Sequence, residues 1–146
     1  MQKKFIVIPH TADIQIRVFG ATLQELFEHA LFGMFQTIEP RSDACTVAEG
    51  LLICANLDRQ HTANIQASDK ESLLVDFLSH ALFLSDVHNE AYFTVQFHTF
   101  FDTALQATIR GVSISGFNVE IKAVTYHGMK LEHVGGLWQT DIVFDI

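Results

Sequence analysis

Basic side chains are scarce in this chain. Nine Lys and Arg residues stand against seventeen Asp and Glu residues, for a formal net charge of −8. No run of Lys or Arg is longer than Lys3-Lys4. The phosphates of a nucleic acid repel such a chain, which excludes direct, tight binding to DNA or RNA as its main task. A basic protein partner or a cation suits this charge better.

Cysteine is also rare, and long apolar runs are missing. Cys45 and Cys54 form no CxxC pair, which excludes the common zinc and thiol redox motifs. The apolar run at residues 5–8 stops at Pro9 and is too short for a signal peptide, and no apolar run approaches the length that crosses a bilayer. We therefore expect a cytoplasmic protein, not bound to a membrane, in which both cysteines are reduced.

Apolar residues are nevertheless plentiful. They make up 49% of the 146 residues, and 13 are Phe. A chain of this length buries roughly two-thirds of its unfolded surface, so a packed core is expected and disorder is excluded. No linker interrupts the pattern, and we expect one domain, residues 1–146.

Two segments have the apolar period of amphipathic helices. Residues 22–38 begin with a capping box from Thr22 to Glu25 and end before Pro40. A second helix starts near Ser68 and Asp69, again with a capping box, to Glu71. Its expected core residues are Leu73, Leu74, Phe77, Leu78, Ala81 and Leu82.

The remaining periodic segments alternate as strands do. Their expected ranges are 4–8, 14–19, 47–55, 60–67, 92–100, 104–110, 119–126, 129–133 and 137–146. Several are joined by hairpin-like turns. The pattern predicts an α+β fold, in which two amphipathic helices pack on a largely antiparallel sheet of about seven strands.

Two carboxylates stand at the ends of the first and last long strands. Asp13 opens one strand, and Asp145 lies beside the terminal carboxylate of Ile146 at the end of the other. If these strands are neighbours, the three groups form an oxygen-rich site for a hard divalent cation. The alternation of Trp138, Thr140, Ile142 and Phe144 predicts that the side chain of Ile146 is buried. The alternative is that both Asp residues only cap strand ends.

Three polar residues are candidates for the same corner. His10 and His127 are expected at strand ends, where an imidazole can bond a ligating carboxylate or carry a proton. Lys122 lies on the predicted strand 119–126, where the alternative is a solvated lysine on a sheet face. Motifs for nucleophilic catalysis, phosphate-binding loops and H-E-x-x-H are missing, so no catalytic residue is assigned.

Five blocks of the sequence resemble the archease family. They are HTAD at residues 10–13, the helix at 22–38, LLVDFL at 73–78, EIKAVTYHGMK at 120–130 and FDI at 144–146. The order and spacing of the blocks match the family over nearly the whole chain. Pro9 stands where the family commonly has an acidic residue.

The resemblance implies a cytoplasmic accessory protein, not itself an enzyme, that activates an RtcB-type RNA ligase in tRNA processing and splicing or in RNA repair. It implies that the protein promotes ligase guanylylation and multiple turnover and binds a divalent cation, with calcium expected and magnesium or manganese as alternatives. The implied cation site is Asp13, Asp145 and Ile146, and the implied polar cluster is His10, Lys122 and His127. Two other interpretations stay open: a metal-dependent hydrolase using Asp13, Asp145 and His127, and a general chaperone-like binding module.

Overall fold

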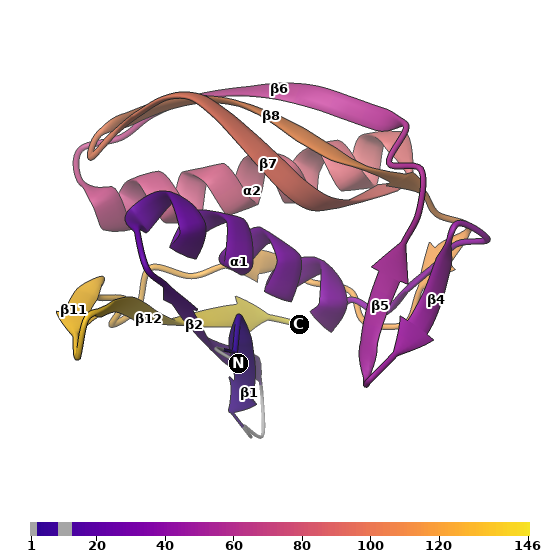
Figure 1. The fold of residues 1–146 in the computed structure, drawn as a ribbon, viewed down its shortest axis with the longest axis horizontal. Coiled ribbons are helices and arrows are strands. Elements are labelled where there is room, and N and C mark those ends of the chain that lie inside the picture. Colours follow the sequence, from indigo (N-terminus) through magenta and orange to yellow (C-terminus); the bar gives the residue numbers. More distant parts are fainter. Residues whose placement is uncertain (1–2, 9–12) are drawn as a thin grey trace.

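The fold places two helices between two sheets (Figure 1). The computed structural model describes residues 3–8 and 13–146. One sheet, which we call the terminal-strand sheet, contains β1 (Phe5–Ile8), β2 (Asp13–Gly20), β12 (Leu137–Asp145) and β10 (Ala123–Val124) in that order, with β11 (Glu132–Val134) also paired to β12. The second sheet contains β6 (Arg59–Gln66), β8 (Ala104–Ser113) and β7 (Glu90–Phe101).

Helices α1 (Leu23–Thr37) and α2 (Lys70–His88) fill the layer between the sheets. Helix α1 packs against β2 on one side and β7 on the other, and α2 packs against β6, β7 and β10. Every expected core residue of α2 is buried except Leu82, which is half-buried. The α+β class is confirmed, and all pairings among the described strands are antiparallel.

The first capping box forms as predicted, and the second does not. The Thr22 hydroxyl accepts from the Glu25 amide at 3.1 Å, and the Glu25 carboxylate accepts from the Ala21 amide at 2.9 Å. At α2 the cap is Asp69, whose carboxylate accepts from the Ser72 amide at 2.7 Å. That bond holds the pKa of Asp69 below its ordinary value. The Glu71 carboxylate is instead an acceptor for the amide of Leu131, at 3.0 Å.

The predicted single sheet of about seven strands is wrong in detail. The described residues contain two larger sheets and two small two-stranded sheets, β3 (Pro40–Arg41) with β9 (Gly116–Phe117) and β4 (Cys45–Ala48) with β5 (Leu51–Cys54). The predicted strand 119–126 shrinks to the two residues of β10, and the predicted strand 47–55 is a hairpin. The hairpin turns at Glu49 and Gly50, which both have positive φ, 52° and 78°.

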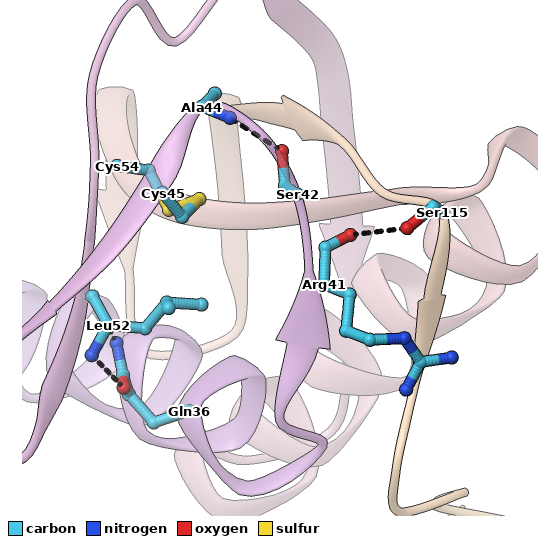
Figure 2. The surroundings of a disulfide bond; sticks show 8 residues. All are labelled: Gln36, Arg41, Ser42, Ala44, Cys45, Leu52, Cys54 and Ser115. Atoms are coloured by element: carbon cyan, nitrogen blue, oxygen red, sulfur yellow. Dashed lines mark hydrogen bonds between the residues drawn. A yellow bond between two sulfur atoms is a disulfide. The ribbon is translucent and has the colours of Figure 1, made fainter.

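This hairpin also corrects the expectation of reduced cysteines. Cys45 and Cys54 are register partners across β4 and β5, and they form a disulfide with a Cα–Cα distance of 3.9 Å (Figure 2). The side-chain amide of Gln36 on α1 donates to the Leu52 carbonyl and accepts from the Leu52 amide, both at 2.8 Å. The hairpin is thus closed by a covalent bond and attached to α1 by a two-bond clamp.

Candidate functional site

The first and last long strands are neighbours, as the proposed acidic corner requires. β2 pairs antiparallel with β12 along its whole length, and Asp13 is the register partner of Asp145. The alternation of the two strands turns Ile14, Ile16, Ile142 and Phe144 toward the helices and the core. Asp13 and Asp145 therefore lie together on the outer face of the sheet, at its end.

The same outer face carries a second set of polar side chains. Arg17 and Asp141 are also register partners, and the Arg17 guanidinium donates two hydrogen bonds to the Asp141 carboxylate, at 2.7 and 3.1 Å. Gln15 donates to Asp141 at 3.1 Å. The bond from Arg17 to Asp141 raises the pKa of the guanidinium above its already high value. Asp141 thus has a cationic partner on its own sheet face, four residues along the strands from the Asp13–Asp145 pair.

Two carboxylates directly opposite each other repel, which is unfavourable in a sheet. A hard cation between them would remove that repulsion, and carboxylate oxygens are the ligands that Ca²⁺ and Mg²⁺ prefer. One oxygen of Asp13 is buried, whereas Asp145 is exposed. Among residues 3–8 and 13–146, no group of three or more His, Cys, Asp and Glu side chains could hold a metal. The donor chemistry of the facing pair therefore suits a cation, and within the described residues the pair supplies two side-chain carboxylates.

Ile146 does not have the buried side chain that the alternation predicts. It is 40% exposed, although Ile142 and Phe144 are fully buried. The reason is that β12 ends at Asp145, so Ile146 follows the last paired residue. Its side chain does not anchor the chain end in the core.

The predicted polar cluster consists of Lys122, His127 and His10, and the structure describes the first two of these residues. The Lys122 amide donates to the Asp145 carbonyl at 2.7 Å, so the backbone of Lys122 touches the acidic pair. Lys122 also lines a groove against α2 that neither Asp13 nor Asp145 lines. His127 is exposed in the turn after β10. His10 lies outside the described residues.

Sequence reasoning missed the contacts that hold the segment between β10 and β11. The Tyr126 hydroxyl donates to the Asp76 carboxylate on α2 at 2.6 Å. This bond, with some burial, raises the pKa of Tyr126 to about 12. Together with the bond from Leu131 to Glu71, it attaches the segment that carries His127 to α2. Asp76 and Tyr126 are 50 residues apart in the chain, so no local pattern linked them.

A second missed group surrounds a buried acid. The Glu90 carboxylate accepts from the buried Tyr92 hydroxyl at 2.7 Å and lies 2.7 Å from Nε2 of His61. Burial, and then the bond to Glu90, raise the pKa of Tyr92. The His61 ring stacks on that of His88, with centroids 4.4 Å apart. The group comes from β6, β7 and the end of α2, so no short motif could have signalled it.

Comparison with known proteins decides the family. A match to the archease protein family (MTH1598/TM1083) covers residues 5–146. The chain belongs to the archease family. It is 31% identical over 153 residues to an archease of Methanosarcina mazei, and 32% identical over 155 residues to one of Methanosarcina acetivorans. Each of these matches covers 99% of this chain and 97% of the relative.

Solved archease-like structures have the same fold. The solution structure of protein 1598 of Methanobacterium thermoautotrophicum matches 99% of this chain and all of its own, with a TM-score of 0.70 and 25% identity. A crystal structure of an archease of Thermotoga maritima, described as a possible chaperone, matches the whole chain and 98% of its own, with a TM-score of 0.62 and 24% identity. No helix in the described part of the archease chain is long and apolar enough to cross a membrane.

Proposed function

We propose that this archease is an accessory protein that activates an RtcB-type RNA ligase in tRNA splicing or RNA repair. In this proposal the protein promotes guanylylation of the ligase and lets the ligase turn over repeatedly, without catalysing a reaction itself. The observation that carries the proposal is the pair of facing carboxylates, Asp13 and Asp145, at the end of the terminal strands of an archease-family chain. Its net charge of −8 favours a protein partner over RNA.

The proposed cation site consists of Asp13, Asp145 and the terminal carboxylate of Ile146. Calcium is the first candidate, and magnesium and manganese are alternatives, because all three take oxygen ligands. A bound cation would supply positive charge close to the phosphate groups on which a ligase acts. Because the described residues offer two side-chain carboxylates there, water or groups of the partner would complete the coordination.

The polar cluster has supporting roles in this proposal. Lys122 offers a point charge for a phosphate or a carboxylate of the ligase. His127 stands on a turn whose neighbour Tyr126 is bonded to α2, so its backbone is held in place. His10 precedes Asp13 by three residues and completes the cluster in sequence.

We place the protein in the cytoplasm with its ligase. The disulfide between Cys45 and Cys54 then has to persist in a reducing compartment, where most protein disulfides do not. The pair is distant in sequence from the acidic corner, and the proposed activity does not use it.

The direct test is multiple-turnover RNA ligation by the cognate ligase, with and without this chain. The chain should raise both turnover and ligase guanylylation. Asp13→Ala and Lys122→Ala should remain folded and lose most of this stimulation, whereas Asp102→Ala, an exposed carboxylate in the turn between β7 and β8, should retain it. Unchanged ligation across several nucleotides and metals contradicts the proposal.

Two outcomes would favour the alternatives. Phosphodiesterase turnover by the purified chain with metal alone would point to a hydrolase. Binding to many unrelated unfolded proteins, independent of Asp13, would point to a general chaperone. The Thermotoga maritima archease is described as a possible chaperone.

A further inference from the structure

A groove runs along the second half of α2 on the core side of the terminal-strand sheet. Its volume is about 490 Å³, within the range of sites that hold small ligands or short peptide segments. One wall is α2 from Ser79 to Asp86, and the other is the segment 119–124 that leads into β10. The apolar lining residues include Ile38, Leu82, Phe83, Phe117, Val119 and Ile121.

Two aromatic side chains border this groove without being buried by the fold. Phe83 is 61% exposed and Phe117 is 42% exposed, whereas Phe27, Phe35 and Phe77 are fully buried. An exposed apolar patch around a concave surface is typical of a binding site for another molecule.

The polar residues of the groove restrict the charge of an occupant. Asp86 and Glu120 line it with exposed carboxylates, and Lys122 is the single cationic side chain among its lining residues. The chain as a whole carries a net charge of −8. The local and the overall charge both favour an occupant with basic side chains.

The backbone of the edge strand β10 restricts the conformation of an occupant of the groove. β10 is the last strand in the order of the terminal-strand sheet, so no strand among the described residues pairs with its second edge. The segment 119–124 that lines the groove contains this edge strand. An open edge beside an apolar groove suits an extended peptide, whose main chain pairs with the edge while alternate side chains enter the groove.

We propose that this groove binds an extended segment of a protein partner, in which apolar side chains alternate with basic ones. The apolar side chains pack on Leu82, Phe83 and Ile121, and a basic side chain pairs with Asp86 or Glu120. This goes beyond the proposed function, because the Asp13–Asp145 pair does not line the groove.

The test is selection of a random peptide library displayed on phage against the full chain, followed by affinity measurements with the enriched peptides as synthetic probes. Enriched sequences should alternate apolar and basic residues. Phe83→Asp and the charge reversal Asp86→Lys should each weaken binding by about tenfold or more. The matched control is Phe101→Asp, because Phe101 is similarly exposed, at 65%, but ends β7 beside the start of α2. It should change the affinity by less than about twofold.

Asp13→Asn should retain peptide binding, which separates this proposal from the cation proposal. Three results would overturn the groove proposal: peptides whose binding does not depend on Phe83 or Asp86, enrichment of acidic or helix-forming peptides, and no enrichment over an immobilised Phe83→Asp chain. Self-association that Phe83→Asp abolishes would also overturn it, since a second copy of the chain would then be the occupant. If Phe83→Asp fails to fold by circular dichroism, Asp86→Lys alone decides between these results.

Discussion

Single residues show most clearly what the sequence could not predict. The facing of Asp13 and Asp145 could be predicted, because both stand at the ends of strands with a strong apolar alternation. The partners of Glu90 and Tyr126 could not be. Each of these contacts depends on segments that the packing of α2 brings together. Single His, Tyr and Glu residues form no periodic pattern in the sequence from which the contacts could be predicted. The prediction that Ile146 is buried was wrong because the pairing of β12 with β2 ends one residue earlier, at Asp145.

Tyr126 leads to a prediction about pH. Its pKa in the folded chain is raised to about 12 from an ordinary 10.0, first because its hydroxyl donates to Asp76 and then because of burial. Above pH 10 the unfolded chain therefore loses this proton before the folded chain does. The stability that the bond contributes is fully present below pH 10 and is lost as the pH rises toward 12.

Absorbance of the phenolate measures this directly, because the chain has only two Tyr residues and burial raises the pKa of the other, Tyr92, as well. The folded chain should show almost no phenolate at pH 10. Asp76→Asn should move the first ionisation down toward pH 10. A first ionisation near pH 10 in the unmodified folded chain would show that the Tyr126–Asp76 bond does not form in solution.

Glu90 leads to a prediction about stability. Its side chain is 8% exposed, and it accepts from the hydroxyl of the fully buried Tyr92 and contacts His61. Glu90→Ala leaves the Tyr92 hydroxyl buried without its acceptor and removes the carboxylate that contacts Nε2 of His61. We expect a loss of about 2–4 kcal/mol in the free energy of unfolding.

Urea unfolding followed by circular dichroism gives this free energy. Glu132→Ala, at an exposed position of β11, is the control and should change it by less than about 0.5 kcal/mol. Equal effects of the two substitutions would mean that the buried network adds little to stability.

At the scale of elements, long periodic segments were predictable and short edge segments were not. Helix α1 appears within one residue of its expected ends, and α2 begins within two residues of its expected start, because their apolar stripes and caps are local signals. The segment 119–126 has the alternation of a strand, but β12 pairs with β2 along one edge and divides its other edge between β10 and β11. The hairpin of β4 and β5 was missed because its turn begins with Glu49, a residue that rarely marks such a turn.

The β4–β5 disulfide gives a prediction at this scale. The bond links residues nine apart, and closing so short a loop in the unfolded chain stabilises a fold by about 2–3 kcal/mol at most. A reductant should therefore lower the melting temperature of the chain by several degrees. The double variant Cys45→Ser with Cys54→Ser should melt at the lower temperature with or without reductant.

Ligase stimulation by this variant should be unchanged, since the hairpin carries none of the residues proposed for the cation or the ligase. Quantitative labelling of both thiols in chain purified without reductant would contradict the disulfide itself.

For the whole molecule, the arrangement of layers determines what each surface can do. The helices occupy both inner sheet faces, so polar residues of the terminal-strand sheet gather on its outer face, where Asp13 and Asp145 meet (Figure 1). The groove beside α2 lies at the β10 end of the same sheet, and neither Asp13 nor Asp145 lines it. The molecule therefore has two candidate surfaces, the acidic Asp13–Asp145 pair and the largely apolar groove beside α2. Lys122 contacts both, because its amide donates to the Asp145 carbonyl and the residue also lines the groove.

The central claim is that the Asp13–Asp145 pair, with the carboxylate of Ile146, holds a divalent cation. Isothermal calorimetry with CaCl₂ and MgCl₂ tests it on the native chain, on Asp13→Asn and Asp145→Asn, and on a chain extended by a C-terminal tag. The claim predicts one bound cation per native chain, loss of binding in both substitutions, weaker binding in the tagged chain, and only a small change in melting temperature throughout. The same tag at Met1 should leave binding intact. Equal heats of binding for all of these chains would contradict the claim and leave Asp13 and Asp145 as ordinary residues at strand ends.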